Sequence, residues 1–423
     1  MNQNILDKLI NVNEKRILKR SFFWNMIASI LNGFTSAIFL FFITRFCGLN
    51  EAGIFSIASA IAYQCISLGN FGTRGVHASD VKEEFSFCDY FYVRIFSYLL
   101  LLMMLLYYAF GSGYSLDKSL VILSYGLFKS IDVIEDLYHG EYHRRMRLDI
   151  AAILLTFRYI ISIVCFIVII LFTDDMFIAS IISFVLSLLI FIFTNKNVIH
   201  YFYNKKYKFS FGNFKKLLYV LIPVVLTTYI KMYINNSPKY AIDACLGNID
   251  QAYFNVLYMP VFVIGLMCDI IFRPYIPLFS NSWNTRDFRE FKTLLFRQIF
   301  VIIGITVAVI LGGYIIGLTL LELIYGVQLH QFMISFMLLL IGGGLNTLYS
   351  YLTVVMTVIR SQKKMAFVNI IVFAVCLIIM NPLVRKYEIF GATLISVTLN
   401  LIAVILSSII VLYDYFKYKK MQK

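Results

Sequence analysis

Twelve long apolar runs dominate this chain of 423 residues. A helix needs about 20 apolar residues to cross the hydrocarbon core of a bilayer. The composition agrees, since 60% of the residues are hydrophobic and only 14% are charged, whereas soluble domains are about one quarter charged. We predict an all-α polytopic membrane protein with about twelve transmembrane helices, at residues 22–45, 52–72, 89–112, 118–138, 150–173, 176–194, 217–236, 251–279, 294–317, 331–359, 365–384 and 390–413.

The basic residues between these runs predict the orientation. With a cytoplasmic N-terminus, the cytoplasmic segments carry 26 Lys and Arg residues, and the outer segments carry only Arg45, Lys118, Lys239, Arg385 and Lys386. Cytoplasmic loops of membrane proteins carry such an excess, so both termini are predicted to be cytoplasmic. The same loops account for the net charge of +14, and we expect no nucleic-acid partner.

The runs divide into six and six. Segments after the first and seventh runs match at an offset of 199 residues, pairing Gly48 with Gly247, Glu51 with Asp250 and Phe55 with Phe254. Halves with an even number of spans enter the membrane in the same sense. We predict a cytoplasmic N-terminal segment at 1–21, a six-helix half at 22–194, a basic cytoplasmic linker at 195–216, a second six-helix half at 217–413 and a basic cytoplasmic tail at 414–423.

The fourth run carries charges in its middle. Asp132 and Asp136 follow Lys129 at i+3 and i+7, so the three side chains share one helical face. Charges inside a membrane face the bundle interior or a wet cavity and usually pair. Two interpretations stay open: a self-neutralising cluster that holds this helix in the bundle, or a substrate or ion site with its own counter-charges.

Polar residues also align on runs one, seven and ten, which favours a central wet cavity shared by both halves. Its predicted substrate-binding residues are Lys129, Arg158, Lys231, Arg273, Asn32 and Asn346. Desolvated carboxyl groups suit proton or cation coupling, and the candidates are Asp132, Asp136, Asp269 and Glu322. A simpler role remains open for each of two candidates. Asp269 could only pair with Arg273, and Glu322 could only be a residue of an outer-surface loop.

Three further expectations concern bending and snorkelling. Pro223 and Pro260 interrupt helix hydrogen bonding and are predicted hinges. The glycines at 342–344 are expected to add a flexible point. Arg94, near a cytoplasmic helix end, is expected to snorkel towards water.

Catalytic and cofactor signals are weak. The seven cysteines and five histidines are dispersed, which predicts neither a disulfide framework nor a metal site. No phosphate-binding loop of the Walker type is present. We therefore expect no cofactor and no enzymatic activity, with transport driven by a gradient such as H⁺ or Na⁺.

Three segments resemble a known family. They are Ile43-Thr-Arg-Phe-Cys-Gly-Leu-Asn-Glu-Ala-Gly-Ile-Phe55, Asn70-Phe-Gly-Thr-Arg74 and Phe272-Arg-Pro-Tyr-Ile-Pro-Leu-Phe-Ser280. With the length and the six-plus-six layout, they resemble Wzx-type polysaccharide flippases of the multidrug/oligosaccharidyl-lipid/polysaccharide (MOP) exporter superfamily. The resemblance implies a multi-pass protein of the bacterial inner membrane. It also implies that polymerase and chain-length proteins of the same pathway are partners.

The implied activity is translocation of undecaprenyl-pyrophosphate-linked oligosaccharide by alternating access, for O-antigen or capsule-type polysaccharide. Lys and Arg are natural ligands for the pyrophosphate, and the prenyl tail stays in membrane lipid. A cation-coupled multidrug antiporter of the same superfamily is an alternative, against which the basic excess counts. A polysaccharide polymerase is another, against which the short outer loops count.

Overall fold

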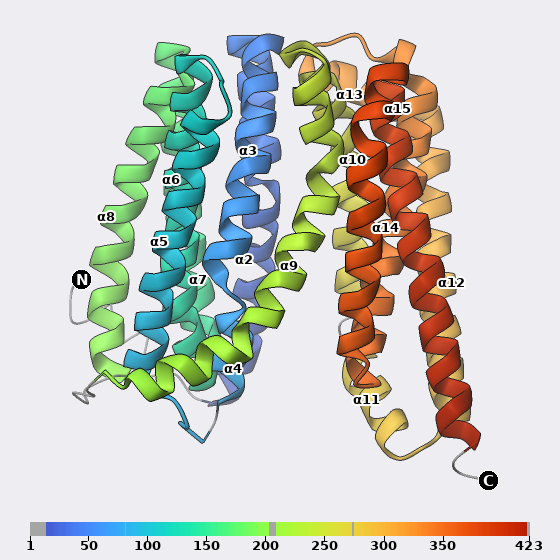
Figure 1. The fold of residues 1–423 in the computed structure, drawn as a ribbon. Coiled ribbons are helices and arrows are strands. Elements are labelled where there is room, and N and C mark those ends of the chain that lie inside the picture. Colours follow the sequence, from blue (N-terminus) through green and yellow to red (C-terminus); the bar gives the residue numbers. More distant parts are fainter. Residues whose placement is uncertain (1–13, 81, 203–208, 273–274, 421–423) are drawn as a thin grey trace. The chain divides into compact units, whose positions relative to one another are not determined.

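The computed structural model describes residues 14–80, 82–202, 209–272 and 275–420, and within them the regular structure is entirely helical (Figure 1). This confirms the predicted all-α polytopic class. The helices are α2 (Glu14–Phe42), η1 (Ile43–Cys47), α3 (Leu49–Asn70), α4 (Thr73–Ser79), α5 (Phe87–Gly111), α6 (Leu116–Arg144), α7 (Leu148–Thr173), α8 (Met176–Phe202), α9 (Phe211–Cys245), α10 (Asn248–Phe272), α11 (Ile276–Asn284), α12 (Phe288–Gly312), η3 (Gly313–Gly317), α13 (Leu318–Tyr325), η4 (His330–Phe332), α14 (Met333–Val358) and α15 (Gln362–Lys420).

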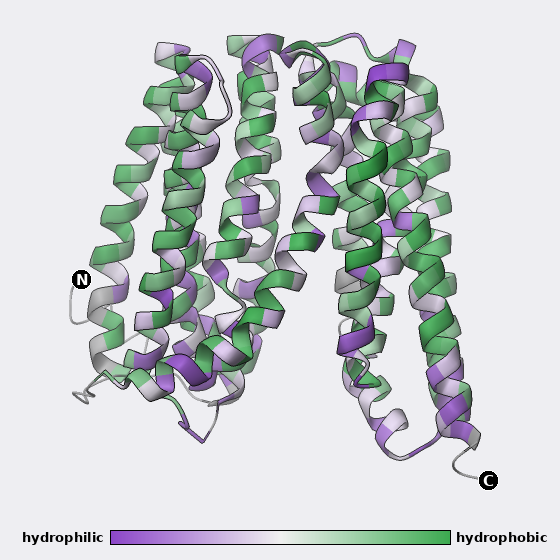
Figure 2. Ribbon diagram, viewed as in Figure 1, coloured by the Kyte–Doolittle hydropathy of each residue, from purple (hydrophilic) through white to green (hydrophobic). Residues whose placement is uncertain are grey.

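Most predicted apolar runs coincide with a long helix or with part of one, whereas the run at 251–279 covers most of α10 and the beginning of the separate helix α11. Ten helical stretches in the described chain are long and apolar enough to cross a membrane. α6 is absent from these because it carries charges along its length, and α15 contains the last two runs. Figure 2 shows hydrophobic residues along most helices and hydrophilic residues concentrated near their ends.

The last two runs are joined by a sharp turn inside α15. Glu388 departs from helical geometry, with φ 52° and ψ −132°. Close to it, a Cβ on Gly391 would collide with the backbone carbonyl of Leu383. The turn therefore needs glycine at this position, because the returning backbone leaves no room for a side chain.

The chain forms two compact units, Met1–Met232 and Tyr233–Lys423. The boundary between them falls inside α9, which continues past the predicted end at residue 236. Pro238 lies within this continuous helix. Proline is tolerated in membrane helices where neighbours satisfy the freed backbone groups, so it did not end the helix here.

In the first unit, α6 is the central helix and contacts α3, α4, α5, α7 and α8. Its charged side chains therefore face protein and not lipid. Aromatic rings fill the space beside it. Phe39 and Phe166 stack with ring centroids 3.8 Å apart, and Phe55 meets Tyr125 edge-on at 5.0 Å. Such aromatic pairs stabilise a core beyond their buried area.

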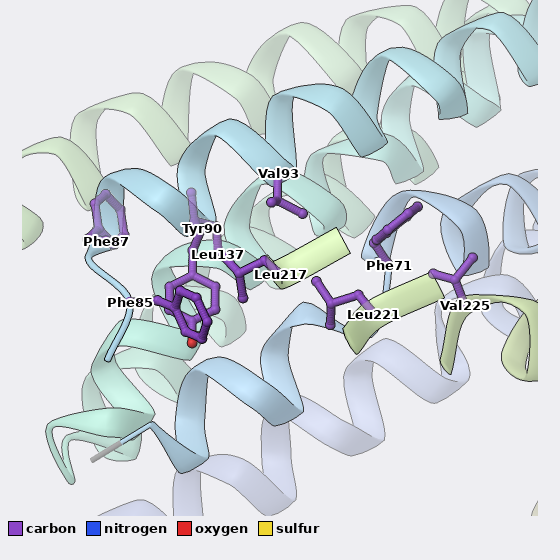
Figure 3. Packing of buried hydrophobic residues seen from close by; sticks show 9 residues of the cluster. All are labelled: Phe71, Phe85, Phe87, Tyr90, Val93, Leu137, Leu217, Leu221 and Val225. Atoms are coloured by element: carbon purple, nitrogen blue, oxygen red, sulfur yellow. The ribbon is translucent and has the colours of Figure 1, made fainter. Parts of the chain in front are cut away.

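The first part of α9 packs on the first unit through one face. Leu217, Leu221 and Val225, spaced one turn apart, are buried in a cluster with Phe71 and Tyr90 (Figure 3). The remaining members of this cluster are Phe85, Phe87, Val93 and Leu137. Most of the intervening residues, such as Tyr219, Val220, Ile222 and Val224, are exposed, as an amphipathic spacing requires.

In the second unit, α14 contacts α10, α12 and α15. Its three consecutive glycines are buried and each adjoins a different helix. Added Cβ atoms would lie 3.4 Å from Val397 on α15, 2.8 Å from Val261 on α10, and against the Thr306 side chain on α12. The expected flexible point is therefore a packing site, because small residues let helices approach closely.

The matched segments occupy equivalent places in the two units. Glu51 and Asp250 are each the third residue of their helix, α3 and α10. An acidic side chain there interacts favourably with the helix dipole. Phe55 and Phe254 follow four residues later and are both buried in a core. The repeat thus preserves a helix start and its first core contact.

Candidate functional site

A buried network of charges joins α6, α7 and α8 in the first unit. The Arg158 guanidinium on α7 donates to Glu135 Oε2 at 2.7 Å, to Asp132 Oδ1 at 2.5 Å and to Ser187 Oγ at 2.9 Å. Its planar fork of donors suits several oxygen partners at once. Arg158 is 1% exposed, so these contacts replace its hydration shell.

Lys129 completes the network from the same face of α6. Its ammonium pairs with Asp132 and donates to the Tyr159 hydroxyl at 3.2 Å. The Tyr159 oxygen also lies 2.7 Å from the Asn32 side-chain carbonyl and 2.9 Å from Asp132 Oδ2. The structure thus brings together four residues predicted as site residues: Lys129, Arg158, Asp132 and Asn32. We call these four, with Glu135 and Tyr159, the α6 charge network.

Glu135 was missed by the sequence reasoning. Besides Arg158, its carboxylate accepts a long bond of 3.4 Å from the Asn195 amide, and His139 Nε2 lies 3.7 Å away. Its signal was a carboxyl group inside the fourth apolar run, one turn after Asp132. Glu135 lies off the helical face shared by Lys129, Asp132 and Asp136, so spacing along α6 alone does not group it with them.

The α6 charge network is internally balanced. Two cations, Lys129 and Arg158, meet two carboxylates, Asp132 and Glu135. Removing one partner from such a buried set leaves an uncompensated charge. The contacts favour the interpretation of a self-neutralising cluster. Asp132 and Asn32 remain partly accessible, so the network presents a carboxylate and an amide, rather than free cations, at its open edge.

Asp136 belongs to a second group, one turn further along α6. Its Oδ2 accepts from Arg94 Nη2 at 2.9 Å, while its Oδ1 lies 3.5 Å from Arg74 Nη1. Arg94 is 3% exposed and also donates to the Gly69 carbonyl at 2.8 Å and to the Thr73 hydroxyl. The expectation that Arg94 snorkels to water is wrong, because its guanidinium is held by the end of α3, the start of α4 and Asp136 within α6.

The other predicted residues lie apart from the network. Lys231 is half-buried on α9. Asn346 lies on α14, and its Oδ1 is buried without a hydrogen-bond partner in the described part of the chain. Pro223 and Pro260 lie inside α9 and α10, which continue through them.

Arg273 and the Asp269 side chain lie outside the described residues, so their predicted pairing stays a prediction.

The Glu322 carboxylate on α13 binds the segment that leads to α14. Its Oε1 accepts from the backbone N–H groups of Leu329 at 2.5 Å and His330 at 3.1 Å, and lies 2.8 Å from His330 Nδ1. Every one of these contacts closes the segment between α13 and α14. Glu322 itself lies on α13 rather than in a loop, and coupling by Glu322 stays a prediction.

Lys239 is a second residue that sequence reasoning placed elsewhere. Assigned to an outer loop, it lies on α9, half-buried, with its ammonium 5.9 Å from the Tyr258 ring on α10. No carboxylate pairs with it among the residues described. Asn255, one turn before Tyr258, has a buried Oδ1 without a hydrogen-bond partner there. Within the described residues, the second unit thus holds a half-buried cation without a carboxylate partner.

Comparisons with known proteins agree on a transporter fold. No protein-family model matches the chain. The capsular polysaccharide biosynthesis protein CapF of Staphylococcus aureus is 20% identical over 405 residues, covering 95% of this chain and 99% of that protein. Similarity at this level spans the whole length of both proteins.

Solved structures match over a similar extent. The lipid II flippase MurJ, in an inward closed conformation, has a TM-score of 0.71 at 14% identity, covering 93% of this chain and 89% of its own. An inward-facing multidrug resistance MATE family transporter of the MOP superfamily has a TM-score of 0.66 at 12% identity, covering 94% of this chain and 99% of its own. A MOP superfamily transporter from Pyrococcus furiosus with a binding pocket of reverse polarity has a TM-score of 0.60 at 13% identity, covering 99% of this chain and 98% of its own. The chain therefore has the fold of MOP-superfamily transporters and is a multi-pass membrane protein.

Proposed function

We propose that this protein is a flippase for undecaprenyl-pyrophosphate-linked oligosaccharide repeat units in a bacterial inner membrane. The observation that carries the proposal is a transporter fold shared over nearly the whole chain with a lipid II flippase. The full-length similarity to a capsular polysaccharide biosynthesis protein supports the glycan part. The transported units would serve O-antigen or capsule-type polysaccharide, and the protein would act without catalysis, beside a polymerase and chain-length proteins.

The distribution of charge supports an anionic cargo. Cations of the α6 charge network are bound to carboxylates, whereas among the described residues the Lys239 ammonium lies near the Tyr258 ring and pairs with no carboxylate. A half-buried ammonium is poorly hydrated and gains most from an anionic partner. We assign Lys239 to the pyrophosphate during transport, while Lys231 and Asn346 stay predicted substrate-binding residues. Lys129 and Arg158 would keep their helices in place.

Energy coupling is proposed at the open edge of the α6 charge network. Asp132 is the more accessible of its two carboxylates and contacts Lys129, Arg158 and Tyr159. Binding of H⁺ or Na⁺ there would alter the balance between these partners, and through them the packing of α6 on α7.

A strain lacking the gene tests the proposal. We expect loss of surface polysaccharide, with completed lipid-linked units accumulating on the cytoplasmic face of the membrane. Single units that reach the surface without polymerisation would instead indicate a polymerase. Unchanged polysaccharide with increased drug sensitivity would contradict the flippase assignment and favour the multidrug antiporter.

Variants of Lys239 refine the test. A hydrogen bond to a charged group contributes about 1.5–3 kcal/mol, so Lys239→Gln should lower export about tenfold or more. Lys239→Arg should retain most export, and Lys239→Glu should be worse than Lys239→Gln. Lys386→Gln is the matched control, because Lys386 also lies over a tyrosine ring but is exposed. Normal export by Lys239→Glu at normal protein levels would contradict this role.

A further inference from the structure

A cavity of about 540 Å³ opens beside α4 in the first unit. It is lined by Arg74, Gly75, Ala78 and Ser79 of α4 and by His143 from the last turn of α6. This end of α6 lies on the side predicted to be cytoplasmic. The cavity is distinct from the α6 charge network, and the transport role proposed above does not use its residues.

The cavity carries a surplus of positive charge. Arg74 and Arg94 share one carboxylate, Asp136. Arg94 is buried and holds Asp136 at 2.9 Å, whereas Arg74 stands 3.5 Å away with 43% of its side chain exposed. Asp136 is therefore already neutralised by Arg94, and the Arg74 guanidinium, which is partly exposed and lines the cavity, can accept a further anionic partner.

The α4 wall of the cavity is fixed firmly to α6. His77 Nε2 lies 3.0 Å from Glu141 Oε2, and the His77 ring stacks on Tyr90 with centroids 4.0 Å apart. Gly140 permits this approach, because a Cβ there would lie 2.5 Å from His77 Nδ1. Glu141 is held in turn by Arg144 at 2.6 Å. Arg74 is thus presented from a rigid support, which preorganises it for a ligand.

We propose that this cavity binds a diphosphate group on the cytoplasmic side before transport. A guanidinium recognises phosphate oxygens through two parallel hydrogen bonds, and the His143 imidazole can add a donor. Gly75 and Ala78 leave space beside Arg74, and no atom lies within 4 Å of a Cβ added at Gly75. The inference rests on the proposed function for the identity of the diphosphate carrier, the prenyl-linked substrate.

Binding to purified full-length protein in detergent tests this inference. The probes are farnesyl pyrophosphate, inorganic pyrophosphate and phosphatidylglycerol, measured by titration calorimetry in wild type and in Lys239→Gln, so that the Lys239 contribution is separated. We expect Arg74→Gln to weaken the binding of farnesyl pyrophosphate at least tenfold. Arg74→Lys should weaken it less than Arg74→Gln, since lysine keeps the charge but lacks the two parallel donors of the guanidinium. Gly75→Leu should also weaken binding by filling the cavity.

Matched controls separate binding from folding. Arg289→Gln removes an exposed arginine, and Gly304→Leu adds bulk where nothing lies within 4 Å of an added Cβ. Both should bind like wild type. Arg74→Gln should unfold at the wild-type temperature, because Arg94 still neutralises Asp136.

The outcomes separate the sources of the anion. Tighter binding of farnesyl pyrophosphate than of inorganic pyrophosphate, lost in Arg74→Gln, supports the prenyl-linked source. The reverse preference with the same Arg74 dependence supports a diphosphate site for the free anion and contradicts the substrate assignment. Phosphatidylglycerol binding that depends equally on Arg74 contradicts a diphosphate site. Binding of all probes independent of Arg74 overturns the inference, while polysaccharide export in cells still tests the proposed function separately.

Discussion

Arg158 shows how a single side chain ties several helices together. It extends from α7, and its guanidinium reaches two carboxylates on α6 and a hydroxyl on α8. A buried cation with complete hydrogen bonding is compatible with a membrane interior, whereas a buried carboxylate without its cation is not. The residue therefore acts on the packing of the first unit.

We expect Arg158→Met to lower the free energy of unfolding by about 3–5 kcal/mol, because Glu135 loses its main counter-charge in a buried site. The double variant Arg158→Met/Glu135→Leu should recover part of this loss. Thermal unfolding of the purified protein in detergent measures both, with Arg289→Met as the exposed control. Additive losses in the double variant would show that the two side chains do not stabilise each other.

Helix α9 illustrates how burial can be tested within one element. Leu221 is buried in the cluster of the first unit (Figure 3), while its neighbours Val220 and Ile222 are exposed. Leu221→Ala should destabilise by about 2 kcal/mol or more, since it leaves a cavity in packed surroundings. Val220→Ala should change unfolding little. Equal losses of stability in the two variants, measured in the same thermal assay, would contradict the burial of the Leu221 face of α9.

Helix α14 distinguishes a hinge from a packing site. Gly344 adjoins the Thr306 side chain, so Gly344→Val should destabilise the second unit by about 1–3 kcal/mol through overpacking. Thr306→Ala should relieve part of this effect by removing the opposing atoms. Gly304→Val, in open space, is the control. A variant that unfolds like wild type but no longer exports polysaccharide would instead support a flexible point in α14.

At the scale of the whole molecule, orientation in the membrane stays a prediction of the charge distribution. In a variant without its seven native cysteines, single cysteines replace Glu84, Ser112, Arg286 and Gln328. A maleimide that cannot cross the membrane should label positions 112 and 328 from outside intact cells, and positions 84 and 286 only after lysis. Labelling in the opposite pattern would invert the predicted topology.

The sequence by itself determined the class of the protein and the positions of its spans. Apolar run length depends only on neighbours along the chain, and a bilayer imposes one length on every crossing helix. The pairing of Lys129 with Asp132 was predictable for the same reason, because i+3 spacing alone places them together. One boundary was wrong: the seventh run was predicted to end at residue 236, whereas α9 continues to Cys245.

The partners of most charged residues were decided only by the tertiary structure. Arg158 meets Glu135, Arg94 meets Asp136, and Asn32 meets Tyr159, across 23, 42 and 127 positions of the chain. Spacing along one helix cannot indicate which helix lies beside it or how it is rotated. Whether a membrane cation meets a carboxylate, as Arg158 does, depends on that packing, because a counter-charge acts through distance in space.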